Sequence, residues 1–246
     1  MVRTLLVRGM LAGLAAAVLA WVFAYFVGEP ALDGGISYED MLAAAAGEAG
    51  DEPPVSRATQ STVGLLVALV IYGVAVGGIF ALVYAGVYGR LGRLSARATA
   101  GVLALVGYVA VVLVPFLKYP SNPPASSADD TIGLRSGTFV LMVLLSVAAA
   151  VGAAFLARAL VARLGTWNGV LASVVAYVVV VGIVGALLPT IAETPADFPA
   201  VVLYDFRMST LGLHAILWGV LGLLFGALVD GGSRRARARS EVAVES

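Results

Sequence analysis

Six long runs of apolar residues dominate the sequence and decide which kinds of fold are open to it. Each run has about the 20 residues that an α-helix needs to cross a bilayer. Only 12% of the residues are charged, against roughly 25% in soluble domains. We therefore predict an all-α integral membrane protein, with a single domain over 1–230 containing a bundle of about six transmembrane helices. The predicted spans are 5–27, 62–88, 98–117, 138–160, 168–190 and 209–229.

The first span follows two arginines and could be mistaken for a signal peptide. Its apolar stretch is long and ends in "WVFAYFVGEP", with bulky aromatic residues and no small-residue cleavage pattern. We expect it to be a retained helix.

Basic residues fall mainly on one side of the predicted spans. That side holds most of the 15 lysines and arginines, namely Arg3, Arg8, Arg90, Arg93, Arg97, Arg158, Arg163, Arg234, Arg235, Arg237 and Arg239. Positive charge is retained in the cytoplasm, so we expect a multi-pass protein of the inner (plasma) membrane with both termini cytoplasmic. Residues 231–246 then form a basic cytoplasmic tail that meets anionic lipid. The exceptions are Arg57, Lys118, Arg135 and Arg207.

Acidic residues are distributed the opposite way. The predicted outer face holds Glu29, Asp33, Glu39, Asp40, Glu48, Asp51, Glu52, Asp129, Asp130, Glu193, Asp197 and Asp205. Such a face would concentrate cations near the surface. A solvated acidic face with no further role explains the pattern equally well, and both interpretations stay open.

Small residues recur at helical spacing within three of the spans. They are Gly9, Gly13 and Ala17 in the first, Gly73, Gly77, Ala81, Ala85 and Gly89 in the second, and Gly222 and Gly226 in the last. In lipid, small residues let helix backbones approach closely. The pattern predicts a tight bundle or a homo-oligomer formed through helices.

Several classes of function are excluded by what the sequence lacks. It has no cysteine, which rules out disulfides and thiolate metal sites, and its one histidine is His214. The net charge is zero, so there is no general attraction for nucleic acid. No HExxH motif, nucleotide-binding loop or intramembrane aspartate pair is present, and we expect no enzyme activity and no resident cofactor. His214 is the one ionisable group deep within a span, and it serves either a functional or a packing role.

Prolines shape three polar segments on the predicted outer face. The segment "KYPSNPPASSADDTIGLR" lies between the third and fourth spans, and its prolines favour rigid geometry over further helix. We expect it to form an ordered lid that positions Asp129 and Asp130 at the rim and docks a partner. Arg135 and Arg207 each precede a predicted span, and we expect them to tie the loops together by pairing with carboxylates such as Glu29 or Asp205. The residues expected to order these loops are Tyr119, Pro120, Asn122, Pro123, Pro124, Arg135, Pro199 and Arg207.

Four stretches together resemble the CbtA-type predicted cobalt transporter subunits. They are "EPALDGGISYE", "VSRATQSTVGLLVALVIYGVAVGGIFALVYA", "PFLKYPSNPPASSADDTIGLRSGTFV" and "AETPADFPAVVLYDFRMSTLGLHAILW". The resemblance implies a membrane subunit of cobalt uptake linked to cobalamin biosynthesis. It also implies a small single-span partner, CbtB, that carries a His-rich motif. Where many members of the family have histidines in the first outer loop, this chain has Glu48, Asp51 and Glu52.

The leading hypothesis is a permease-like subunit that admits Co²⁺ as its transported ion. Carboxylates and one imidazole suit Co²⁺, which accepts mixed oxygen and nitrogen ligation. The candidate metal ligands are Glu29, Glu39, Asp197 and His214. The alternative is a non-transporting scaffold or assembly subunit whose outer loops dock a metal-binding partner. Few charges lie within the predicted spans, which favours this second interpretation.

Overall fold

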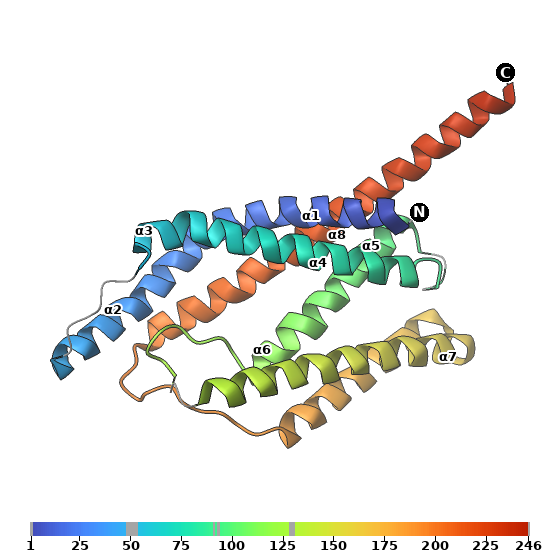
Figure 1. Cartoon of the computed structure of the whole chain (residues 1–246). Coiled ribbons are helices and arrows are strands. Elements are labelled where there is room, and N and C mark those ends of the chain that lie inside the picture. The colour runs from blue at the N-terminus through green and yellow to red at the C-terminus, as the bar shows by residue number, and fades with distance from the viewer. Residues whose placement is uncertain (1, 48–53, 91, 93, 128–130, 246) are drawn as a thin grey trace. The chain divides into compact units, whose positions relative to one another are not determined.

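The computed structural model describes residues 2–47, 54–90, 92, 94–127 and 131–245, the side chains of 233–245 excepted. Regular secondary structure in this part of the chain is entirely helical (Figure 1), and the all-α prediction is confirmed. Five helical segments are long and apolar enough to cross a membrane: Val2–Ala46, Arg57–Val87, Ala96–Lys118, Ile132–Leu187 and Ala200–Gly232.

Three of these segments contain a short π-helical turn. They are α1 (Val2–Phe23), η1 (Ala24–Gly28) and α2 (Glu29–Ala46); α3 (Arg57–Thr59), η2 (Gln60–Gly64) and α4 (Leu65–Val87); and α5 (Ala96–Gly107), η3 (Tyr108–Leu113) and α6 (Val114–Lys118). Both η1 and η3 end shortly before a proline, Pro30 and Pro115. A proline cannot donate to the carbonyl four residues earlier and its ring crowds that carbonyl. The wider π turn shifts the backbone hydrogen bonds at this point, and the helix continues past the proline.

The helix that contains the predicted first span, 5–27, therefore continues past Pro30. Pro30 lies in the first turn of α2, directly after the π turn η1. The segment Val2–Ala46 has 45 residues, more than twice the number needed for one crossing. It ends at Gly47, which adopts the left-handed conformation with φ 73°. Much of the expected first outer loop is consequently helix.

Helix α7 (Ile132–Leu187) covers the two spans predicted at 138–160 and 168–190. Its 56 residues are interrupted at Gly165, whose φ of 77° and ψ of 167° are not helical. The two arms turn back on each other there (Figure 1), since the hydroxyls of Ser146 and Tyr177 are 2.8 Å apart. A side chain at Gly165 would be strained at this φ. The reversal at Gly165 thus joins two antiparallel helical arms.

The chain divides into two compact units, and the single-domain prediction stays a prediction. Unit 1 comprises residues 1–26, 53–105 and 212–246, and unit 2 comprises 27–52 and 106–211. Helix α8 (Ala200–Glu245) contributes its beginning to unit 2 and the rest to unit 1. Its helical backbone extends through the predicted tail, and it begins well before the predicted span at 209.

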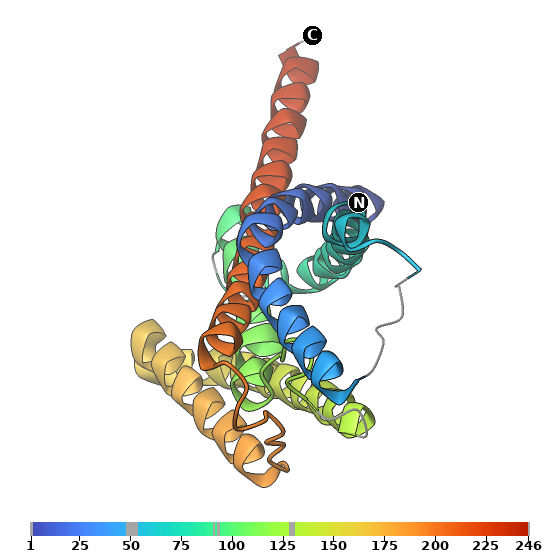
Figure 2. The same cartoon turned by 90° about the vertical axis from the view of Figure 1, so that its left-hand side faces the viewer.

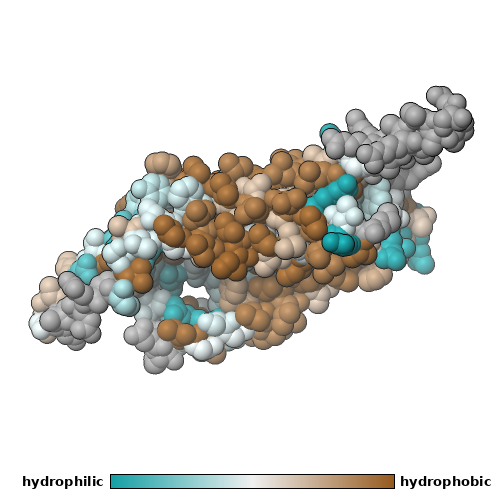
Figure 3. All heavy atoms as spheres, turned by 45° about the horizontal axis from the view of Figure 1, so that its top comes forward, coloured by the Kyte–Doolittle hydropathy of each residue, from teal (hydrophilic) through white to brown (hydrophobic). Residues whose placement is uncertain are grey.

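Unit 1 is held together by close backbone contact between α1 and α4, which lie side by side in both views (Figures 1 and 2). A Cβ atom on Gly13 would collide with the carbonyl oxygen of Gly73, and one on Gly9 with that of Gly77. Small residues therefore let these two helices approach closely, as the spacing indicated. On the face of the pair that Figure 3 shows, hydrophobic residues cover the middle and hydrophilic residues lie toward the ends.

Aromatic side chains join α8 to α4 in the same unit. Phe225 packs edge-on against both Phe80 and Tyr84, at centroid distances of 5.3 and 4.9 Å. Gly222 faces α5, where a Cβ added to it would collide with the Cβ of Ala104. This packing buries Tyr84 and Phe225 fully.

Candidate functional site

The polar segments of unit 2 gather into one ordered assembly, which we call the loop cluster. It consists of α2, residues 119–127, residues 188–199 and the first turns of α8 as far as Arg207. Residues 128–130 lie outside the described residues, and so do the predicted rim carboxylates Asp129 and Asp130.

A tight turn gives the proline segment its shape. The backbone N–H of Ser126 donates to the carbonyl of Pro123 over 3.3 Å, and the Ser126 hydroxyl donates to the same oxygen over 2.6 Å. Ala125, the third residue of the turn, has a φ of 57°. A proline second and a positive φ third are the marks of a type II turn. The sequence Asn-Pro-Pro thus leads into a defined turn.

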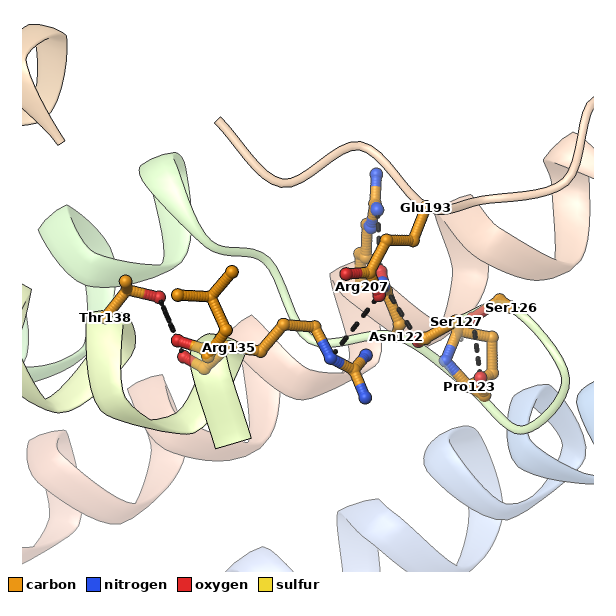
Figure 4. Close-up of polar contacts among 9 residues, drawn as sticks. Asn122, Pro123, Ser126, Ser127, Arg135, Thr138, Glu193 and Arg207 are labelled. Atoms are coloured by element: carbon orange, nitrogen blue, oxygen red, sulfur yellow. Dashed lines mark hydrogen bonds and ion pairs between the residues drawn. The ribbon is translucent and has the colours of Figure 1, made fainter. Parts of the chain in front are cut away.

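Arg207 of α8 fastens this turn to the helix. Its Nη2 donates to the side-chain oxygen of Asn122 over 2.8 Å (Figure 4). Its Nε donates more weakly to the Ser121 carbonyl, over 3.4 Å. The expected carboxylate partner is thus replaced by a neutral amide. Arg207 lies in the second turn of α8, whereas the sequence had placed it before a helix.

Arg135 of α7 makes the second tie, to the loop 188–199. Its Nε lies 3.5 Å from Oε2 of Glu193 (Figure 4). The two side chains are 29% and 10% exposed, so this is a largely buried ion pair. Neither carboxylate oxygen of Glu193 has a hydrogen-bond partner among the described residues. The predicted tie exists, but its acidic partner is Glu193 instead of Glu29 or Asp205.

Two further hydrogen bonds join the same loops. The Tyr119 hydroxyl donates to the Pro189 carbonyl over 2.8 Å. Lys118 Nζ donates to the Thr190 hydroxyl over 3.4 Å. The loops on either side of α7 are therefore fixed to each other by both side chains and backbone.

Helix α2 packs onto these loops through its glycines. A Cβ on Gly35 would lie 2.9 Å from the Cβ of Pro123, and one on Gly34 would lie 3.1 Å from Val202. The Tyr38 ring packs edge-on against Phe198 at a centroid distance of 4.9 Å. Through these contacts helix α2 packs as part of the loop cluster. The sequence did not indicate this helix, because its residues are too polar for a span.

Three of the four candidate metal ligands belong to unit 2. Glu29 begins α2 and is 9% exposed, whereas Glu39 is exposed on the same helix. Ten helical residues separate them by about 15 Å, which is too far for one ion. Asp197 lies near the Tyr38 hydroxyl. These carboxylates share a region of the fold without forming a common ligand set.

His214 belongs to unit 1, in α8. Its ring packs edge-on against Tyr72 at 5.9 Å. Its Nδ1 is buried with no hydrogen-bond partner among the described residues. A free imidazole nitrogen is available for a ligand, while the aromatic contact accounts for the packing role.

Within the described part of the chain, no three His, Asp or Glu residues are grouped so that they could hold a metal ion. Glu48, Asp51 and Glu52 lie outside that part. The ligand assignments therefore stay predictions. The sequence analysis did not single out Glu193 as a site residue. The one indication of its role is that an acidic residue stands there between apolar residues and Thr-Pro.

One comparison with known proteins gives a match. The family model described as "Probable cobalt transporter subunit (CbtA)" matches residues 2–230. Neither the comparison with curated proteins nor that with solved structures gives a match.

Proposed function

Because the chain belongs to the family of probable cobalt transporter subunits, CbtA, we propose that it is the membrane subunit of a cobalt uptake system. The observation that carries this proposal is the family match over 2–230 of the 246 residues. The five long apolar helices suit a multi-pass protein. The link to cobalamin biosynthesis and the His-rich single-span partner are parts of this proposal.

The proposed topology has six crossings in the inner membrane and both termini in the cytoplasm. It counts the two arms of α7 as separate crossings on either side of Gly165. Arg158 and Arg163 lie next to that reversal, and positive charge near a short loop favours the cytoplasmic side. On this topology the loop cluster faces outward.

In the proposed mechanism, acidic residues of the loop cluster collect Co²⁺ from outside. Glu29, Glu39 and Asp197 provide oxygen ligands at separate positions, and His214 provides the one imidazole. The partner supplies further imidazoles, which bind Co²⁺ more selectively than carboxylates do. The ordered loops hold the entrance in a fixed shape, because two arginines and a buried tyrosine tie them together.

Uptake of labelled cobalt tests the proposal directly. Cells that express the chain with its partner should accumulate cobalt at limiting concentration, and cells without the chain should not. Glu29→Gln and His214→Ala should each lower uptake about tenfold, since loss of a residue beside a metal commonly costs 10–100-fold in affinity. Glu245→Gln offers a control in the tail that the proposed topology places in the cytoplasm, and it should leave uptake unchanged. Normal uptake in both variants at equal membrane abundance would remove these two ligands.

A scaffold subunit is the second candidate function. It is favoured by the lack of any three-residue metal-binding group within the described residues, which a docking subunit does not need. If the chain is a scaffold, its deletion should lower the abundance of the partner. Liposomes with purified chain alone would then admit no cobalt, nickel or zinc, and only the reconstituted pair or the partner would bind metal.

A further inference from the structure

An open apolar groove lies in unit 2 where α6 ends and α8 begins. Its volume is about 320 Å³, near the lower end of the roughly 300–1,000 Å³ range of small-molecule pockets. Apart from one arginine its lining is apolar or aromatic: Phe116, Leu117, Pro120, Ala200, Leu203, Tyr204, Arg207 and Met208. The groove is therefore lined mainly by apolar side chains, with the cation Arg207 on its wall.

The positive charge of Arg207 is balanced by opposite charge less well than the charges of two other arginines of the chain. Arg97 pairs with Asp230 at 2.9 Å and Arg135 pairs with Glu193. Arg207 is partly buried, and among the described residues it bonds only the neutral groups of Asn122 and Ser121. A partly buried charge is costly without an opposite charge nearby.

Arg207 also retains free hydrogen-bonding capacity. A guanidinium has five N–H donors, and the two bonds to Asn122 and Ser121 use two of them. The rest can meet a phosphate in the forked geometry that arginine favours. Asn122 and Ser121 hold the guanidinium in place beside the groove.

We infer that this groove binds one anionic phospholipid, with an acyl chain against the apolar lining and the phosphate on Arg207. Its position favours a lipid over a free anion. Leu117 and Tyr204 are 73% and 63% exposed, and both lie at the ends of apolar helices, where tyrosines commonly meet the headgroup region. A free phosphate would leave the apolar lining unused.

Lipid retention by the purified full-length chain tests this inference. The chain is delipidated in detergent, mixed with phosphatidylglycerol or with phosphatidylcholine of the same acyl chains, and weighed by native mass spectrometry. Wild type should retain one phosphatidylglycerol in preference to phosphatidylcholine. Arg207→Gln should lower that retention about tenfold, because a charge-assisted contact is lost, and Leu203→Trp should lower it by filling the groove.

Asn122→Ala is the matched control, since it removes the loop contact of Arg207 and keeps the charge. It should retain phosphatidylglycerol at least about threefold better than Arg207→Gln, with helix content checked by circular dichroism for each variant. Equal retention of the two lipids by wild type would overturn the inference. So would full retention by Arg207→Gln or by Leu203→Trp, or equal retention of inorganic phosphate alone in the same measurement.

Discussion

At the scale of single residues, the ion pair between Arg135 and Glu193 fixes one loop to a helix. Arg135→Gln would leave the Glu193 carboxylate buried without its cation, and we expect a loss of about 1–3 kcal/mol in unfolding free energy. Adding Glu193→Gln should restore most of that loss, because no charge then remains buried. Denaturant unfolding in detergent measures the unfolding free energy of the single and the double variant. Arg158→Gln, at an exposed position of the same helix, should stay within about 0.5 kcal/mol of wild type. An equal loss in the single and double variants would show that the pair contributes nothing.

The turn at Pro123–Ser126 contains the second informative residue. Ala125 is the one non-glycine residue with positive φ in the described chain, a conformation that is costly for alanine. Ala125→Gly should therefore stabilise the protein by about 0.5 kcal/mol, after the entropy that glycine loses on folding is subtracted. Ala196→Gly in the loop 188–199 has no positive φ to relieve, and it should be neutral or destabilising. Thermal unfolding of the two variants side by side gives the answer, and a less stable Ala125→Gly would contradict this account of the turn.

At the scale of elements, hydropathy located the apolar parts of the helices well and their ends poorly. Apolar runs report contact with lipid, whereas helix ends depend on backbone hydrogen bonds and caps. Helix α2 was missed because it is too polar for a span, and the packing of Gly35 on Pro123 is a contact that no local pattern specifies. The early start of α8 has the same cause. Likewise the charge pattern indicated that Arg135 needs a partner, but the choice of Glu193 follows from tertiary packing.

Packing of α1 on α4 gives a prediction at this same scale. A side chain at Gly77 would collide with the backbone carbonyl of Gly9, so Gly77→Val should force the helices apart. We expect a loss of at least about 2 kcal/mol. Gly86 lies on the same helix, where a Cβ would meet no other atom within 4 Å, and Gly86→Val should be nearly neutral. The fraction of folded chain extracted after heating separates the two, and equal behaviour would show that this contact does not stabilise the fold.

At the scale of the whole molecule, the topology decides whether the loop cluster can meet ions from outside. The sequence has no cysteine, so single cysteines can be introduced without any background. On the proposed topology, Ala45→Cys and Ala196→Cys should react with a membrane-impermeant maleimide on intact cells. Arg90→Cys and Ser246→Cys should react only after the membrane is opened. The opposite pattern would turn the loop cluster toward the cytoplasm and remove the proposed entry route for Co²⁺. Labelling at Arg90 and Ser246 on different sides would instead require an odd number of crossings between them, which Ala96–Lys118, the two antiparallel arms of α7 and Ala200–Gly232 do not give.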